Sequence, residues 1–236
     1  MSNSFLETGR TRRTGPILII IAALAVIAIA VTTIVIVVAN TSPDPKPEPS
    51  VQPTLSVPTG PLTLIKGSYT VDGVSVGYPH TVAGAVSAAA EYATQIGSTL
   101  DPDRARMIAG AIADPSFENA RDYFAQGPVN SRQRLSLPLA GPIPANASLT
   151  LGPAAYQLRS PSEDAVVVLI LGYLSMVGSD GKLISKIGVF PMEMHWANSD
   201  WKALKPGTTK ATDFSSLATT PGSSEAAAKG WLELRP

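Results

Sequence analysis

The two histidines, His80 and His195, are the first residues to consider for chemistry, because histidine titrates near neutral pH and binds metal ions. Glu193 lies two residues before His195 on a predicted strand, so the two side chains project from one face. Such a pair is compatible with acid–base catalysis or with half of a metal site. A solvated strand face produces the same pattern, and we favour that interpretation. His80 precedes a predicted helix start, which is typical of a capping or packing residue.

Motifs for other chemistries are missing. The chain has no cysteine, which excludes disulfides, thiolate catalysis and cysteine-based zinc sites. It contains no GxSxG nucleophile turn and no glycine-rich phosphate loop of the GxxxxGK[ST] or GxGxxG type. Asp101, Asp103 and Asp114 are better explained as helix caps and solvated helix charges than as paired catalytic carboxylates. We therefore predict a protein that is not an enzyme, with no catalytic residues, cofactor or metal.

Charge is balanced, with 18 basic and 18 acidic residues in 236. Residues 1–16 carry a net charge of +2, and the part from residue 40 onward carries −2. A nucleic-acid reader normally presents a basic patch or stripe. We expect no direct binding to nucleic acid.

One segment, residues 17–38, contains 22 residues without a charge. A helix rises about 1.5 Å per residue and a bilayer core is about 30 Å thick, so we predict a single transmembrane helix over 17–39. Arg10, Arg12 and Arg13 precede it, which predicts a cytoplasmic N-terminus (residues 1–16) and an extracytoplasmic C-terminal part. Cleavage after Ala39 as a signal peptide is the alternative, but signal peptides have shorter apolar regions.

A proline-rich linker, residues 40–61, is expected next, because seven prolines fall within 42–61. Such a sequence favours extended polyproline II, and twenty residues at about 3.1 Å each reach about 60 Å. A spacer toward a partner and an ordinary disordered tether are both compatible with it. The remaining residues, 62–236, are predicted to form one extracytoplasmic α+β domain.

The first half of this domain is predicted to be helical. Asp72-Gly73 indicates a two-residue hairpin over 69–78, and Thr81 is a helix cap. Asp-Pro pairs at 101–102 and 114–115 are typical of helix starts. The predicted helices cover residues 82–96, 102–113 and 115–125, and Gly127-Pro128 is expected to end this half.

The second half is predicted to consist of strands, at 154–160, 165–176, 184–196 and 201–204. Residues 165–171, AVVVLIL, are apolar throughout, which indicates cover on both faces. Helices can cover one face, whereas the other requires a sheet closing on itself, an apolar ligand or another subunit. Val166, Val168 and Ile170 are therefore a candidate oligomer face. A short helical turn at 224–229 is expected, followed by residues docking back onto the domain.

Aromatic and methionine side chains alternate along the strand at 184–196. Phe190, Met192, Met194 and Trp196 share one face, opposite to Glu193 and His195. These four residues line either a ligand pocket or the core, and we favour the core because the helices must pack there.

The helical first half, the segments VDGVSVGYPHTVAGAVSAAAEYA (71–93) and NSDWKAL (198–204), and the membrane anchor together resemble a known class. The helices-then-sheet order is similar to the cone-shaped nuclear-transport-factor-2-like (cystatin-like) fold. With an anchor and a proline-rich tether, the chain resembles actinobacterial membrane proteins and the VirB-type and TcpC-type assembly proteins of conjugation and type IV secretion. The resemblance implies helices packed on a curved antiparallel sheet in an extracytoplasmic scaffold that forms homo-oligomers and contacts other membrane-complex proteins.

Two other functions remain open. The cone of such a fold can hold a lipid or another apolar molecule, which would make the domain a binding module. The same fold also hosts isomerases and dehydratases, for which Glu193 and His195 would be the acid–base pair.

Overall fold

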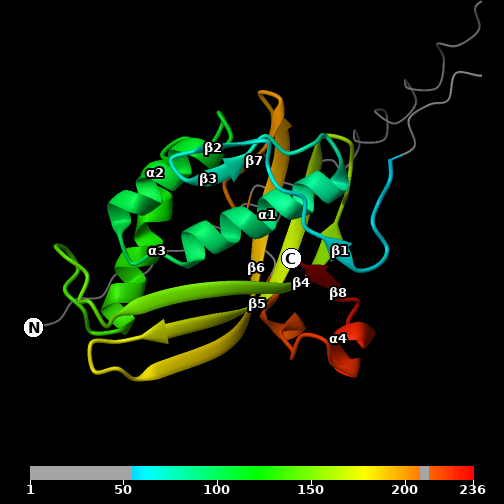
Figure 1. The fold of residues 1–236 in the computed structure, drawn as a ribbon. Coiled ribbons are helices and arrows are strands. Elements are labelled where there is room, and N and C mark those ends of the chain that lie inside the picture. Colours follow the sequence, from blue (N-terminus) through cyan, green and yellow to red (C-terminus); the bar gives the residue numbers. More distant parts are fainter. Residues whose placement is uncertain (1–54, 208–212) are drawn as a thin grey trace, which may run out of the picture. The chain divides into compact units, whose positions relative to one another are not determined.

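The computed structural model describes residues 55–207 and 213–236. In these ranges the chain forms an α+β domain with helices packed on a curved, half-barrel sheet, as the sequence predicts (Figure 1). The predicted transmembrane segment, 17–39, lies outside the described residues. No helix within them is long and apolar enough to cross a membrane.

Six strands form the main sheet in the order β1-β8-β4-β5-β6-β7. Their bounds are β1 Leu62–Thr63, β4 Ser148–Arg159, β5 Ala165–Val177, β6 Leu183–Ala197, β7 Asp200–Ala203 and β8 Leu232–Arg235. All neighbours are antiparallel, as the sequence predicts, except β1 and β8, which pair in parallel at one edge. β7 is not the last strand, because β8 follows it and inserts between β1 and β4.

A separate hairpin confirms the predicted turn at Asp72-Gly73. Its strands are β2 Tyr69–Val71 and β3 Val74–Val76. Asp72 has φ 50° and Gly73 has φ 74°, the left-handed backbone that a tight hairpin of this length requires.

Helix α1, Val82–Gly97, lies across the sheet and begins where the sequence predicts. The Thr81 hydroxyl accepts a hydrogen bond from the Gly84 amide, a normal N-cap. A Cβ atom at Gly84 would lie 2.1 Å from the Pro79 carbonyl oxygen, and one at Gly97 would lie 2.6 Å from the Leu151 side chain. The small residues of α1 therefore let the helix approach both its own entry loop and the sheet.

Helix α2 covers Pro102–Ile112 and has Asp101 as its N-cap, which confirms the helix predicted over 102–113 to within one residue. The next helix does not begin at the second Asp-Pro pair. Instead, the Asp114 amide donates to the Ala203 carbonyl of β7, and Asp114 caps a turn. Helix α3 begins six residues later and covers Ala120–Arg134, with Pro128 inside it. The predicted helix over 115–125, ended by Gly127-Pro128, was therefore wrong in both of its boundaries.

The main core lies between the inner face of the sheet and the helices. Val166, Val168 and Ile170 of β5 are at most 3% exposed and lie in this core with residues of α1 and α2. Their prediction as an oligomer face is corrected by the structure, because the helices of the same chain cover them.

The outer face of β5 is covered by the C-terminal segment of the same chain (Figure 1). This segment contains η1 Ser215–Leu217, α4 Ser224–Ala228 and β8. Leu169 and Leu171 are fully buried in a second cluster with Ala226 and Trp231. The continuous apolar run in β5 thus has cover on both faces, as predicted, but the second cover is neither a ligand nor another subunit.

Candidate functional site

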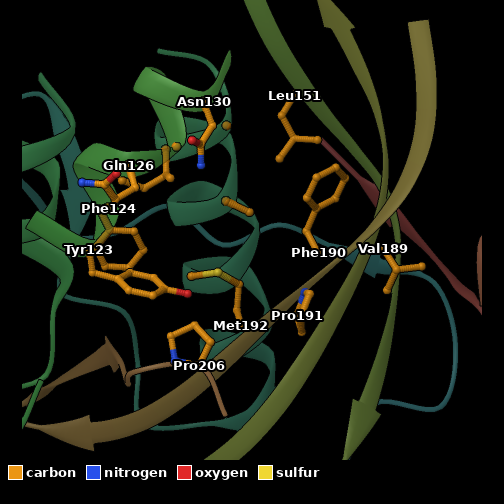
Figure 2. A pocket seen from close by; sticks show the side chains of 14 residues that line it. Tyr123, Phe124, Gln126, Asn130, Leu151, Val189, Phe190, Pro191, Met192 and Pro206 are labelled. Carbon is orange, nitrogen blue, oxygen red and sulfur yellow. The ribbon is translucent and has the colours of Figure 1, made fainter. Parts of the chain in front are cut away.

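An apolar cleft of about 530 Å³ opens between α1, α3 and strands β4 and β6 (Figure 2). Only uncharged residues of the described chain line it: Ala93, Ile96, Gly97, Tyr123, Phe124, Gln126, Gly127, Asn130, Leu151, Val189, Phe190, Pro191, Met192 and Pro206. Its volume lies within the range of about 300–1,000 Å³ that is usual for ligand sites.

One wall of the cleft is a face of α3. Tyr123, Gly127 and Asn130 are four and three residues apart, the spacing that places side chains on one side of a helix. Figure 2 shows the Tyr123 hydroxyl and the Asn130 amide directed into the cleft. Tyr123 is 44% exposed, so this wall is open to solvent.

The opposite wall belongs to β6 and contains two of the four residues that the sequence predicted to face a ligand or the core. Phe190 and Met192 line the cleft and are partly buried. Met194 is 1% exposed in the main core, and Trp196 packs against that core outside the cleft. On this face of β6, Phe190 and Met192 therefore line the cleft, whereas Met194 and Trp196 pack in or against the core.

Pro191 also lies on this wall, at a position where a proline is tolerated. Within the described residues, β7 pairs with β6 only from Met194 onward. Pro191 pairs with β5 alone and leaves the side of β6 opposite β5 without a backbone donor at this position. β6 is therefore an edge strand locally, at Pro191, although β7 pairs with it further along.

The α3 residues that line the cleft were missed by the sequence argument. Tyr123 and Phe124 lie inside the helix predicted over 115–125, whereas Gln126, Gly127 and Asn130 lie beyond its predicted end. Phe124, Gly127 and Asn130 share one helical face, and this spacing is visible in the sequence. Pro128 argued against a helix at this position, because proline is unfavourable in a helix interior.

The favoured interpretation of a solvated strand face is wrong for Glu193, which is 8% exposed, and Glu193 and His195 each have a partner in a different segment of the domain. The His195 Nδ1 atom lies 2.8 Å from the Asp114 Oδ2 atom, and Glu193 accepts a hydrogen bond from the Gly207 amide at 2.7 Å. Neither residue lines the cleft. The two side chains join β6 to the α2–α3 connection and to the chain after β7.

Asp114 is a buried carboxylate with three hydrogen-bond donors. Its side chain is 4% exposed, and its Oδ1 atom accepts from the Ser116 amide and hydroxyl. Burial raises the pKa of Asp114, but the hydrogen bonds from Ser116 and His195 outweigh burial and hold the pKa below its ordinary value. The His195–Asp114 contact thus holds the helical half against β6.

His80 has a packing role. Its ring stacks on Trp196 with centroids 4.1 Å apart, and its Nε2 atom lies 2.8 Å from the Asp164 Oδ1 atom. These contacts join the start of α1 to the β4–β5 turn and to the end of β6. The interpretation of His80 as a packing residue agrees with this geometry.

The NSDWKAL segment also has a structural role. The Asp200 carboxylate is 1% exposed and accepts from the Tyr78 amide, the Trp201 amide and the Lys202 ammonium group at 2.9–3.0 Å. The Trp201 indole donates to the Pro79 carbonyl. The segment therefore closes the β6–β7 turn onto the loop that precedes α1.

No group of three histidine, aspartate or glutamate side chains within residues 55–207 and 213–236 is arranged to hold a metal ion. The predicted absence of a metal, cofactor or catalytic residue is not tested by this finding and stays a prediction.

Residues 60–225, more than half of the chain, match the model of the family called Domain of unknown function (DUF8175). The chain belongs to this family. No curated protein and no solved structure matches the chain.

Proposed function

We propose that this protein is a non-catalytic assembly component of a membrane complex of the conjugative or secretion type. Its outer domain binds an uncharged segment of another protein in the cleft between α3 and β6. The supporting observation is the composition of this cleft, whose described lining contains no aspartate, glutamate, histidine, lysine or arginine. Acid–base catalysis needs such groups within hydrogen-bond reach of the substrate.

The openness of the cleft favours a protein segment over a small molecule. Small-molecule sites usually enclose about 70–90% of the ligand surface. Here Tyr123, Gln126 and Asn130 on the α3 wall are exposed. A chain segment lying across the surface can use such a wall, because its remaining surface continues into the partner.

The location and fold class belong to the same proposal. The uncharged segment at 17–38 and the arginines before it favour a single-pass anchor with a cytoplasmic N-terminus and an extracytoplasmic domain. Helices that precede a curved sheet favour a nuclear-transport-factor-2-like cone. Homo-oligomers are also proposed, formed through a surface other than Val166, Val168 and Ile170.

A second candidate function is the binding of a lipid or other apolar molecule. The observation that favours it is the apolar wall of Phe190, Met192 and Leu151, together with a volume of about 530 Å³. A neutral ligand would suit this cleft better than a fatty acid, since the described lining offers no cation for a carboxylate.

Photocrosslinking separates these functions. The full-length protein, in its native membranes, carries a photoreactive phenylalanine at Gln126 in the cleft wall, or at Gln133 as the control. Gln133 is exposed on the same helix but does not line the cleft. A discrete protein adduct from position 126 that is absent from position 133 is expected. Adducts to lipid alone would support the second candidate, and the absence of any adduct specific to position 126 would refute both.

A further inference from the structure

We propose that the cleft recognises a proline-rich segment in the polyproline II conformation. This inference rests on the proposed function and names the chemistry of the segment that is bound. It comes from the donors on α3, the apolar walls and the neutrality of the lining.

The donors on α3 have the spacing that such a segment requires. Tyr123 and Asn130 are seven residues apart on one helical face, which is about 10.5 Å along the axis at about 1.5 Å per residue. A polyproline II helix repeats every three residues, or about 9.3 Å, so carbonyl groups three residues apart point the same way. Two side chains on α3 thus match two carbonyls three residues apart on one side of the ligand. An extended β-strand repeats about every 6.8 Å and matches this spacing less well.

The hydrogen-bonding character of the cleft is also complementary to proline. Proline has a carbonyl acceptor but no backbone N–H donor, so its partner must supply donors. The Tyr123 hydroxyl and the Asn130 amide supply them, and neither makes a hydrogen bond to another residue in the part of the chain that the structure describes. An acyl chain offers no acceptor to either group.

Between these two donors the helix presents Gly127. A Cβ atom at this position would meet no atom within 4 Å, so the floor of the cleft is open there. A ligand ring can therefore approach the helix backbone between the two donors.

The remaining walls are those that proline rings favour. Tyr123, Phe124 and Phe190 provide aromatic surface, and the lining is uncharged. Proline-rich ligands dock in aromatic-lined grooves and lose little conformational entropy because polyproline II is preformed. Residues 42–61 of this chain also contain seven prolines, but Asp44, Lys46 and Glu48 lie between them, so the proposed occupant is an uncharged proline-rich segment of another protein.

Methyl NMR of the methionines tests the inference on the full-length protein in lipid nanodiscs. Met192 lines the cleft, whereas Met107 lies on the surface of α2 and is 48% exposed. The probe is a ten-residue proline peptide, and a ten-residue glycine–serine peptide is the control. A saturable shift of the Met192 methyl resonance is expected with the proline peptide only, without a shift of Met107.

Three variants test the donors. Tyr123→Phe and Asn130→Ala each remove one donor and are expected to weaken binding of the proline peptide about two- to tenfold, the effect of one net hydrogen bond. Gln133→Ala, on the same helix outside the cleft, is expected to leave binding unchanged. Equal binding by all three variants would refute the role of the donors.

Other results overturn the inference in distinguishable ways. If Met192 responds to a fatty-acid methyl ester but not to the proline peptide, the cleft is a lipid site. If position 126 crosslinks a protein while the proline peptide leaves Met192 unchanged, the proposed function stands and the polyproline inference fails. If no probe shifts Met192 and no crosslink forms, both fail.

Discussion

Replacing Trp231 with alanine tests whether the C-terminal segment is a structural cover of the sheet. Trp231 is 6% exposed, packs with Leu169 and Leu171 on the outer face of β5, and donates its indole N–H to the Leu217 carbonyl at 3.0 Å. Removing a buried tryptophan typically costs about 3–5 kcal/mol. With a urea dependence of about 2 kcal/mol/M, the unfolding midpoint is expected to fall by about 1.5–2.5 M.

The assay is urea unfolding followed by circular dichroism, combined with hydrogen exchange. Because the cover is a separate cluster, the segment can undock before the domain unfolds, and the amides of α4 and β8 would then exchange faster than those of α1. Undocking would expose a contiguous apolar face, so the variant is expected to self-associate in size-exclusion chromatography with light scattering.

Two control variants bracket the effect. Trp231→Phe retains most of the apolar surface and is expected to cost less than the alanine variant. Leu183→Ala changes a residue that is 66% exposed and is expected to shift the free energy of unfolding by no more than about 0.5 kcal/mol. A cost below about 1 kcal/mol for Trp231→Ala would refute the cover and would make the outer face of β5 a candidate interface between subunits.

Three further predictions follow from buried groups and close approaches. Asp200→Ala is expected to lower the free energy of unfolding by about 3–5 kcal/mol in urea denaturation, because its lysine partner and two amides lose their acceptor. Gly84→Ala is expected to cost about 1–3 kcal/mol in the same assay, because its Cβ would lie 2.1 Å from the Pro79 carbonyl oxygen. Asp114 has a lowered pKa when folded, so its stabilising effect is present above the unfolded pKa of about 4 and is lost as the pH falls through the folded value. Unfolding midpoints measured from pH 5 to pH 2.5 are therefore expected to fall more steeply for the native protein than for Asp114→Asn.

Each of these predictions has its own control. Asp200→Asn retains one acceptor oxygen and should recover part of the loss, whereas equal losses would argue against a role for that acceptor. Gly110→Ala in α2 places a Cβ 3.1 Å from the flexible end of Arg121 and is expected to be neutral or stabilising. If Gly84→Ala behaves like Gly110→Ala, the close approach of α1 to its entry loop is wrong. Parallel pH profiles for the native protein and Asp114→Asn would show that Asp114 does not contribute.

Local structure could be predicted where neighbouring residues provide all the interactions. Thr81 and Asp101 cap their own helices, and Asp72-Gly73 forms the expected two-residue turn. The alternation along β6 also placed Phe190, Met192, Met194 and Trp196 on one face correctly. The caps and the turn draw their energy from contacts within a few residues, and side chains alternate between the two faces of any strand, so a sequence pattern records both.

Predictions failed where a distant segment supplied the deciding contact. The second Asp-Pro pair has the local signal of a helix start, but the Asp114 amide bonds to Ala203, 89 positions later in the sequence, and the helix begins at Ala120 instead. Pro128 was expected to end the helix, yet α3 continues through it with the Pro128 side chain buried. Tertiary packing outweighed the local cost of an interior proline.

The sequence by itself determined the α+β class, most element positions, and the requirement that β5 be covered on both faces. Only the tertiary structure decided that Leu169 and Leu171 are covered by Trp231, and that Phe190 and Met192 face Tyr123 and Asn130 across a cleft. The physical reason is that an apolar pattern states how much surface must be buried but not which distant surface buries it. That choice depends on the joint packing of elements that lie far apart in the chain.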